Sequence, residues 1–380
     1  MRLDRRELAG AVADVGVLIP IAVALIVGNG LSATAVLLPA GLLYLTAAWV
    51  YRLPVPVQPL KAFGAIAIAK GLGSDEIAAG ALLMGVIFVT LGRLGLLDLA
   101  ARTFPRPLIR GVQLTVGLLF LKIAWDLVTD PPKGFTDYAL AADWAVPLAL
   151  LTLVLAFALR DYPITLALVA AGGITMVILA GDEAALGPSA LSLPSLDAAT
   201  IATAFTVLVV PQIPLSFANS CLATADAARV YFGELASRVR PGRLATTFGS
   251  ANLLAAAVSG MPVCHGAGGM TAHYAFGART AGAPLAMGLL VLTLAIAVGA
   301  GLADLLAAFP LPILAGVLAT AGVLHILLLR DLRGLRAWLF ALLVGVVGFE
   351  VNLTVALGLG LALWWGAEAL RRFPRLRPAA

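Results

Sequence analysis

The chain has 380 residues, of which 61% are hydrophobic and 12% are charged, and its formal net charge is +5. Soluble domains carry about 25% charged residues and 45–50% apolar residues, so this composition excludes a soluble protein and predicts an integral membrane protein. The positive balance does not indicate a nucleic-acid partner, because in a membrane protein the placement of basic residues matters more than their sum. Two cysteines, Cys221 and Cys264, provide no disulfide framework.

Apolar stretches recur along the chain, many of them close to the roughly 20 residues that cross the hydrocarbon core as a helix. Barrel strands would instead be short segments of alternating hydropathy. The first stretch has no small-residue cleavage motif, so we interpret it as a membrane span and not as a signal peptide. We predict an all-α membrane protein with fourteen transmembrane segments, at residues 9–27, 33–50, 57–70, 77–95, 108–126, 144–159, 163–180, 201–222, 245–259, 266–278, 283–300, 311–329, 336–349 and 351–369.

The arginines orient these segments. With the N-terminus in the cytoplasm, alternate threading places every arginine on the cytoplasmic side, from Arg2 to the cluster at 371–377. The opposite loops, such as GSDE at 73–76, are mostly acidic. The positive-inside bias therefore predicts a multi-pass protein of the inner (plasma) membrane with both termini in the cytoplasm.

Two similar segments indicate an internal repeat. FPRPLIRGV at 104–112 and FPLPILAGV at 309–317 share most positions at an offset of 205, and nearly the same offset aligns Pro56 with Pro262. Proline-rich helix starts can recur without duplication, which is the alternative. Seven spans per half would invert the second copy, as in secondary transporters. We predict a first inverted repeat at 1–190 (spans 1–7) and a second at 200–372 (spans 8–14).

Polar breaks interrupt the third and tenth predicted spans. PVPVQPLKAFGA at 54–65 carries three prolines, and GMPVCHGAGGMTAHYAFGART at 260–280 is rich in glycine. Proline favours a short extended segment, after which a half-helix begins near Leu60. Broken backbone at membrane depth must be buried in protein or line a cavity. Two half-helices whose N-termini face each other would form a pocket for an anion.

Side chains at the two breaks suit this chemistry. Lys61 adds a positive charge, while Gln58 and His265 offer hydrogen-bond donors. Three glycines would allow backbone amides to approach a ligand: Gly266, Gly268 and Gly269. The alternatives are that Lys61 extends to the interface, that His265 is a hydrogen-bonded core residue, and that the glycines serve helix packing.

The histidines and cysteine of the second break do not predict a metal or cofactor. Cys264, His265 and His273 match no known metal-ligand spacing, and Cys264 has no evident partner for nucleophilic catalysis. A membrane enzyme using Cys264 and His265 therefore remains only a minor alternative.

Four further polar residues lie in or near the spans. Asp14 in the first span is a candidate for proton coupling or for an interfacial ion pair. Gln212 follows Pro211 in the broken eighth span and is a candidate ligand, or else an interhelical hydrogen-bond donor. Asn219 lies toward the inner end of that span, and Asp226 lies near its inner mouth, where it could act in gating.

The two breaks closely resemble the signatures of the molybdate transporter family of plants, algae and bacteria, which belongs with sulfate permeases and nucleobase transporters. The similarity covers nearly the whole chain, including PQIPLSFANSCLATADAARVYFG at 211–233. It implies a seven-plus-seven inverted repeat with core and gate domains, and a homodimer. The residues that it implies as substrate ligands are Gln58, Lys61, Gln212, Asn219, Cys264, His265, Gly266, Gly268 and Gly269.

The chain departs from the family pattern at some positions. His273 stands where the family usually has glutamine, and Met270 where it usually has leucine. The chain ends shortly after its last span, without the C-terminal STAS-type domain of sulfate permeases, which favours the molybdate branch.

We therefore expect a secondary active transporter of a tetrahedral oxyanion, most plausibly molybdate, with elevator-like alternating access and Asp14, His273 and Asp226 as candidates for coupling or gating. In the alternatives the fold is the same but the substrate is sulfate, another anion or a nucleobase. A nucleobase would need acidic or amide side chains that bind its edge. Besides the oxyanion, membrane lipid is the expected partner.

Overall fold

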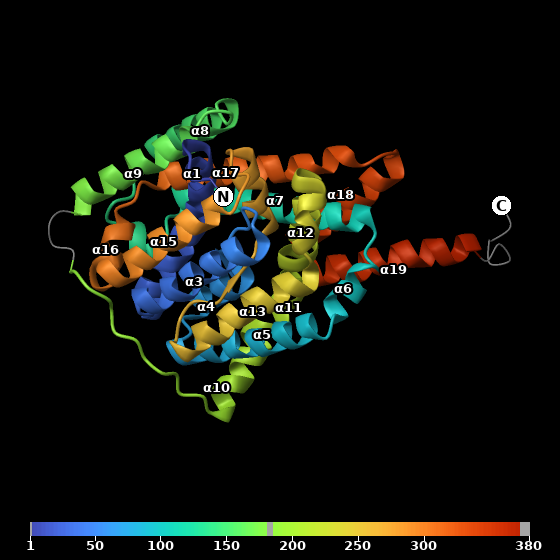
Figure 1. The fold of residues 1–380 in the computed structure, drawn as a ribbon, viewed down its shortest axis with the longest axis horizontal. Helices are drawn as coiled ribbons and strands as arrows, with labels where there is room; N and C mark the ends of the chain where they lie inside the picture. The colour runs from blue at the N-terminus through green and yellow to red at the C-terminus, as the bar shows by residue number, and fades with distance from the viewer. Residues whose placement is uncertain (1, 181–184, 373–380) are drawn as a thin grey trace.

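A computed structural model describes residues 2–180 and 185–372, which are mostly helical (Figure 1). The arginine cluster at 371–377 lies partly outside these residues. The first half of the chain contains α1 (Arg5–Ala11), η1 (Val12–Asp14), α2 (Val15–Val23), η2 (Ala24–Gly28), α3 (Ala33–Tyr51), β1 (Gln58–Pro59), α4 (Lys61–Lys70), α5 (Ser74–Arg93), α6 (Leu96–Ala101), α7 (Arg106–Thr129), η3 (Lys133–Phe135), α8 (Ala142–Ala158) and α9 (Ile164–Ala180).

The second half repeats much of this order. It contains α10 (Ala198–Thr203), η5 (Ala204–Val209), α11 (Val210–Leu215), η6 (Ser216–Ala223), α12 (Thr224–Phe232), η7 (Gly233–Arg238), α13 (Pro241–Ala257), β2 (Val263–Cys264), α14 (Ala267–Ala275), α15 (Gly282–Ala297), η8 (Gly299–Gly301), α16 (Leu302–Ala307), α17 (Leu311–Ile326), η9 (Leu327–Asp331), α18 (Leu335–Glu350) and α19 (Leu353–Arg372).

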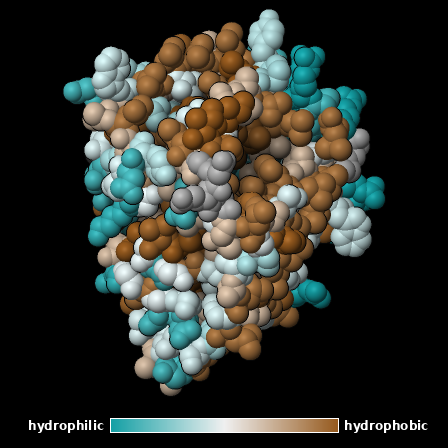
Figure 2. Space-filling view, turned by 90° about the vertical axis from the view of Figure 1, so that its left-hand side faces the viewer, coloured by the Kyte–Doolittle hydropathy of each residue, from teal (hydrophilic) through white to brown (hydrophobic). Residues whose placement is uncertain are grey.

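Helix length and hydropathy are those of a membrane protein. Six continuous helical segments are long and apolar enough to cross a bilayer, and a bent pair, α15 with η8 and α16, would form a seventh across an 83° bend. Each of the fourteen segments predicted above overlaps a helix. Several of these helices are shorter than a full span, and the chain is extended immediately before α4 and α14. Apolar side chains cover much of the face in Figure 2, with hydrophilic residues toward its margins.

The first and eighth predicted spans are continuous but irregular. The first includes a π-helical stretch, η2, after Pro20, and the eighth has π-helical stretches on both sides of the short helix α11. Pro211 and Pro214 lie in α11, where each removes a backbone donor, so the helix widens locally instead of keeping regular hydrogen bonds.

Helices of the two halves pack pairwise through small residues. Helix α5 packs on α13, and α7 packs on α17. A Cβ added at Gly85 would lie 2.9 Å from the carbonyl oxygen of Gly249, and one at Gly117 would lie 2.9 Å from that of Gly322. These glycines let the backbones approach closely, which is how helices associate where lipid supplies no hydrophobic drive.

The two sequence breaks meet in the interior. Strands β1 and β2 form a two-residue antiparallel pair in which Gln58 lies opposite Cys264 and Pro59 opposite Val263. The backbone N–H of Leu60 also donates to the carbonyl of Pro262, at 3.1 Å. The break that prolines predicted before Leu60 is therefore present, and pairing with its counterpart satisfies its backbone within the protein.

Candidate functional site

Helices α4 and α14 begin shortly after β1 and β2, and because the strand pair is antiparallel the two helices leave it in opposite directions with their N-termini toward the pair. Within the described part of the chain, the backbone N–H groups of Lys61 and Ala62 have no hydrogen-bond partner, nor do those of Gly268 and Gly269. Unpaired amides at a helix N-terminus carry partial positive charge and favour an anion. Two such ends therefore lie next to each other in the interior.

Two amide side chains of the eighth predicted span cap these helix starts. Gln212 in α11 accepts a hydrogen bond from the backbone N–H of Phe63, at 2.9 Å, and donates to Ser216 Oγ. Asn219 in η6 accepts from the backbone N–H of Ala267, at 3.3 Å. The sequence interpretation made both residues ligand candidates. The structure places both at the starts of α4 and α14, where each accepts a hydrogen bond from a helix terminus.

Lys61 lies at the first position of α4 and is 8% exposed. Its ammonium donates to Gln58 Oε1 at 2.8 Å and lies 5.2 Å from the centroid of the Phe120 ring. The position of a Cβ on Gly266 would be 3.4 Å from the same nitrogen. The side chain therefore turns into the protein between the two helix starts, and it does not extend to the membrane interface.

The three glycines of the second break have close neighbours. A side chain at Gly266 would overlap Gln58 Oε1, and one at Gly268 would lie 2.5 Å from the Phe120 ring. A Cβ on Gly269 would lie 2.5 Å from Asp14 Oδ1 and 2.6 Å from Gln58 Nε2. Side chains at these three positions would collide with Gln58, Phe120 and Asp14, and they would cover the backbone at the start of α14.

Asp14 is fully buried beside this pocket and has three polar neighbours. Gln58 Nε2 donates to Oδ1 at 2.8 Å, and the Tyr44 hydroxyl donates to Oδ2 at 2.7 Å. His273 Nε2 lies 2.9 Å from Oδ2, while its Nδ1 contacts the carbonyl of Pro54 at 3.0 Å. Asp14 therefore belongs to the interior and not to an interfacial ion pair.

His265 and Cys264 are buried next to the strands. His265 Nδ1 contacts the carbonyl of Pro56 at 2.8 Å, and its Nε2 contacts Thr247 Oγ1 at 2.9 Å. Both ring nitrogens are thus satisfied by the protein, as in a hydrogen-bonded core histidine. Cys264 Sγ lies 3.9 Å from the carbonyl of Pro59.

Asp226 lies in a separate cluster. It forms an ion pair with Arg110 of α7, whose side chain is fully buried and also pairs with Asp331 at the end of η9. Gln113 accepts a hydrogen bond from the same guanidinium. Asp226 also lines a cavity of about 930 Å³, together with residues of α6, α12 and η7. Asp226 therefore links α12 to α7 and does not reach the helix starts through any contact in the structure.

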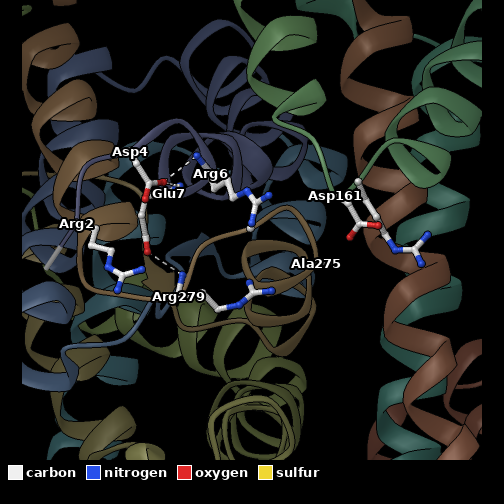
Figure 3. A pocket seen from close by; sticks show the side chains of 9 residues that line it. Arg2, Asp4, Arg6, Glu7, Asp161, Ala275 and Arg279 are labelled. Atoms are coloured by element: carbon white, nitrogen blue, oxygen red, sulfur yellow. Dashed lines mark hydrogen bonds between the residues drawn. The ribbon is translucent and has the colours of Figure 1, made fainter.

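A small pocket of about 150 Å³ lies at the N-terminal segment (Figure 3). Asp4 caps α1 by accepting from the backbone N–H groups of Arg6 and Glu7, and the Glu7 bond holds the pKa of Asp4 below its usual value. Glu7 Oε1 accepts from the backbone N–H of Arg279 at 2.9 Å. The hydrogen bond between Glu7 and Arg279 connects α1 to the loop that follows α14. Because carboxylates lie among the arginines, the pocket is not a concentrated positive site.

Sequence reasoning missed several residues of this region. Tyr44 and Phe120 contact Asp14 and Lys61 from α3 and α7, and Thr247 contacts His265 from α13. Tyrosine, phenylalanine and threonine are common in membrane helices, so no local signal marks them. Arg110 lies at the cytoplasmic end of the predicted span 108–126, and its place within an apolar segment was a signal that it had a buried partner.

Comparison with known proteins identifies the family. The family model described as "Molybdate transporter of MFS superfamily" matches residues 6–120 and 204–324, more than half of the chain. Molybdate transporter 1 of Arabidopsis thaliana is 27% identical over 98% of this chain and 90% of its own length. Molybdate transporter 1 of Chlamydomonas reinhardtii is 26% identical over 99% of this chain and 95% of its own length.

Solved structures support the fold. The transmembrane domain of the cyanobacterial bicarbonate transporter BicA has a TM-score of 0.59 at 22% identity, covering 92% of this chain and 96% of that domain. The murine anion transporter Slc26a9 in its inward-facing state has a TM-score of 0.59 at 14% identity, covering 96% of this chain and 68% of that one. The matched relatives are transporters and not enzymes. With the family model matching across both halves, the chain belongs to the molybdate transporter family.

Proposed function

We propose that the protein is a secondary active transporter that carries a tetrahedral oxyanion, with molybdate as its substrate. The observation that carries this proposal is the position of Lys61. Its buried ammonium lies beside two adjacent helix N-termini with unpaired amides, next to Gly266. A buried cation among backbone donors matches an anion that accepts several hydrogen bonds at once. A nucleobase would instead need acceptors along its edge.

The proposed ligands fall into two groups. Lys61 and the amides of Gly266, Gly268 and Gly269 would contact the anion directly, with Gln58, Cys264 and His265 lining the same pocket. Gln212 and Asn219 would act from the eighth span, since they already hold the helix starts in place. The names of the family relatives favour molybdate, while sulfate or another tetrahedral anion fits the same donors and is the alternative.

We propose elevator-like alternating access as the mechanism. Spans 1–4 and 8–11 would form a moving core that carries the pocket, and spans 5–7 and 12–14 would form the gate. The repeat would divide the chain into 1–190 and 200–372, which gives fourteen spans. Helices α7 and α17 begin at the third position of the same FPxP motif, and β1 and β2 start 205 residues apart, in support of this division.

The core and gate would touch at Asp226 and Arg110, because α12 continues the eighth span while α7 is the fifth. Breaking and reforming this ion pair would accompany core movement. The placement of arginines favours an inner (plasma) membrane protein with cytoplasmic termini. A homodimer is expected from the family resemblance.

A binding titration tests the proposal. Detergent-purified protein should bind molybdate, and sulfate and tungstate should be compared in the same assay. The Lys61→Met variant, which keeps the stem but removes the charge, should bind at least about tenfold more weakly. Lys122→Met is the matched control, because that lysine is exposed and pairs only with Asp126. Equal affinity of Lys61→Met and wild type would remove Lys61 from the site, and absence of binding to all three anions would overturn the proposed function.

A further inference from the structure

The contact between Asp14 Oδ2 and His273 Nε2 lacks a hydrogen-bonding proton when His273 is neutral. The carbonyl of Pro54, 3.0 Å from His273 Nδ1, has no hydrogen to give, so Nδ1 must carry the proton of that hydrogen bond. A neutral imidazole then presents only a lone pair at Nε2. That nitrogen is buried without an aligned hydrogen-bond partner, although Asp14 Oδ2 is 2.9 Å away. A proton taken up at Nε2 would give His273 a positive charge at ion-pair distance from the Asp14 carboxylate, which would replace a contact between an unpaired nitrogen and an oxygen by an ion pair.

Tyr44 supplies its own proton to this carboxylate. Its hydroxyl oxygen lies 2.7 Å from Asp14 Oδ2 and 2.9 Å from the carbonyl of Val57. One hydroxyl proton can serve only one of these two acceptors, and the shorter, charge-assisted contact is the one with Asp14. His273 is therefore the neighbour of Oδ2 for which a further proton is needed.

The other histidines differ from His273 in this respect. His265 contacts a carbonyl through Nδ1 and a hydroxyl through Nε2, so its neutral form is fully satisfied. His325 Nδ1 contacts Thr271 Oγ1 at 2.7 Å, and its Nε2 is also buried without a partner, so it differs from His273 in having no carboxylate at ion-pair distance among the described residues. All three histidines of the chain lie in described residues, and His273 is the one at ion-pair distance from an acid.

One side chain connects this pair to the proposed anion pocket. Gln58 accepts from Lys61 through Oε1 and donates to Asp14 through Nε2, both at 2.8 Å. The charge of Lys61 and that of an ionised Asp14 offset each other across Gln58. A dianion would add two negative charges to this buried region, and uncompensated buried charge is costly. Protonation near Asp14 would lower that cost.

The remaining titratable groups around Asp14 and His273 either have other partners or make no direct contact with these two residues. Glu7 of α1 accepts from the backbone of Arg279, and Tyr231 of α12 donates to Thr271. The titratable and charged groups on the elements around the pair include Arg5, Arg6, Glu7, Tyr44, Lys61, Arg110, Cys221, Asp226, Arg229, Tyr231, Cys264, His265, Tyr274 and His325. Of these, Tyr44 contacts Asp14 directly and Lys61 reaches it through Gln58.

We propose that the Asp14–His273 pair takes up one proton from solvent when the oxyanion binds, so that anion and proton move together. The proton would be shared between Asp14 Oδ2 and His273 Nε2, and it would leave with the anion on the other side of the membrane. This inference rests on the proposed function. By linkage, anion binding and proton binding must strengthen each other by the same factor.

Calorimetric titration of the purified full-length protein with molybdate tests the inference. Titrations in buffers of different ionisation enthalpy give the number of protons taken up per anion. The wild type should take up about one proton, and its affinity should rise up to about tenfold for each unit that the pH falls. His273→Gln keeps a donor for the Pro54 carbonyl but cannot be protonated, so its uptake should fall to nearly zero and its affinity should lose the pH dependence. His325→Gln is the matched control and should behave as the wild type.

The outcomes separate the two proposals. Molybdate binding by the wild type without proton uptake would overturn this inference and leave the transport function intact. Uptake by His273→Gln equal to that of the wild type would also overturn it. No binding of molybdate, sulfate or tungstate by the wild type would instead reject the proposed function. Asp14→Asn provides a second variant, expected to lose proton uptake as His273→Gln does. The wild-type stoichiometry decides the matter even if a variant does not fold.

Discussion

Gln212 accepts a hydrogen bond from the backbone N–H of Phe63, so an amide of the eighth predicted span closes the first turn of a half-helix 149 positions away in sequence. Asn219 does the same for α14 through Ala267. The two helix starts are therefore held by one irregular helix. The shape of the pocket depends on these caps as much as on the β1–β2 pair.

Gln212→Leu should destabilise the protein. The substitution leaves the Phe63 N–H buried without an acceptor, which costs about 1–3 kcal/mol. Thermal unfolding in detergent should show a lower midpoint, and molybdate affinity should fall because the start of α4 is no longer fixed. An unchanged midpoint together with unchanged affinity would contradict this role for the cap.

Gly266→Ala should block the pocket. The new Cβ would overlap Gln58 Oε1 and approach Lys61 Nζ, so both side chains would have to leave their positions between the helix starts. We expect at least about tenfold weaker anion binding, since a charge-assisted contact is lost. Gly173→Ala is the control, because a Cβ there has no heavy atom within 4 Å. Wild-type affinity of Gly266→Ala would show that the anion does not bind between these helix starts.

His265→Ala should weaken both folding and uptake. The substitution removes the partner of the Pro56 carbonyl, and a buried group left unpaired costs about 1–3 kcal/mol. Unfolding midpoints and vesicle uptake should be measured on the same preparation. A loss of uptake with an unchanged midpoint would point to direct contact with the anion, whereas normal uptake would restrict His265 to a core role.

Asp226→Asn should alter transport more than binding. The substitution weakens the ion pair with Arg110 between α12 and α7 but leaves every contact of the anion pocket in place. A conformational equilibrium biased by such a contact shifts by about 5–150-fold for a coupling of 1–3 kcal/mol. Uptake rate should therefore change while molybdate affinity stays within a factor of about three. A large fall in affinity with an unchanged maximal rate would place Asp226 at the pocket instead.

The sequence by itself determined that the chain is a helical membrane protein, and it located the two breaks. Composition is sufficient for the first, because so few charged residues leave no soluble surface. For the second, the prolines at 54–59 and Pro262 with its neighbouring Gly260 disfavour a regular helix locally, and buried backbone must then find partners. The FPxP motifs marked the starts of α7 and α17 for the same local reason.

Only the tertiary structure decided which polar groups meet. The pairing of Asp14 with His273 joins residues 259 positions apart, and no local pattern encodes it. The burial of Arg110 against Asp226 and Asp331 likewise depends on three different helices. Hydropathy gives the depth of each side chain along its own helix. It does not give the rotation and contacts of that helix against its neighbours, which bring a proton-binding pair next to the proposed anion pocket.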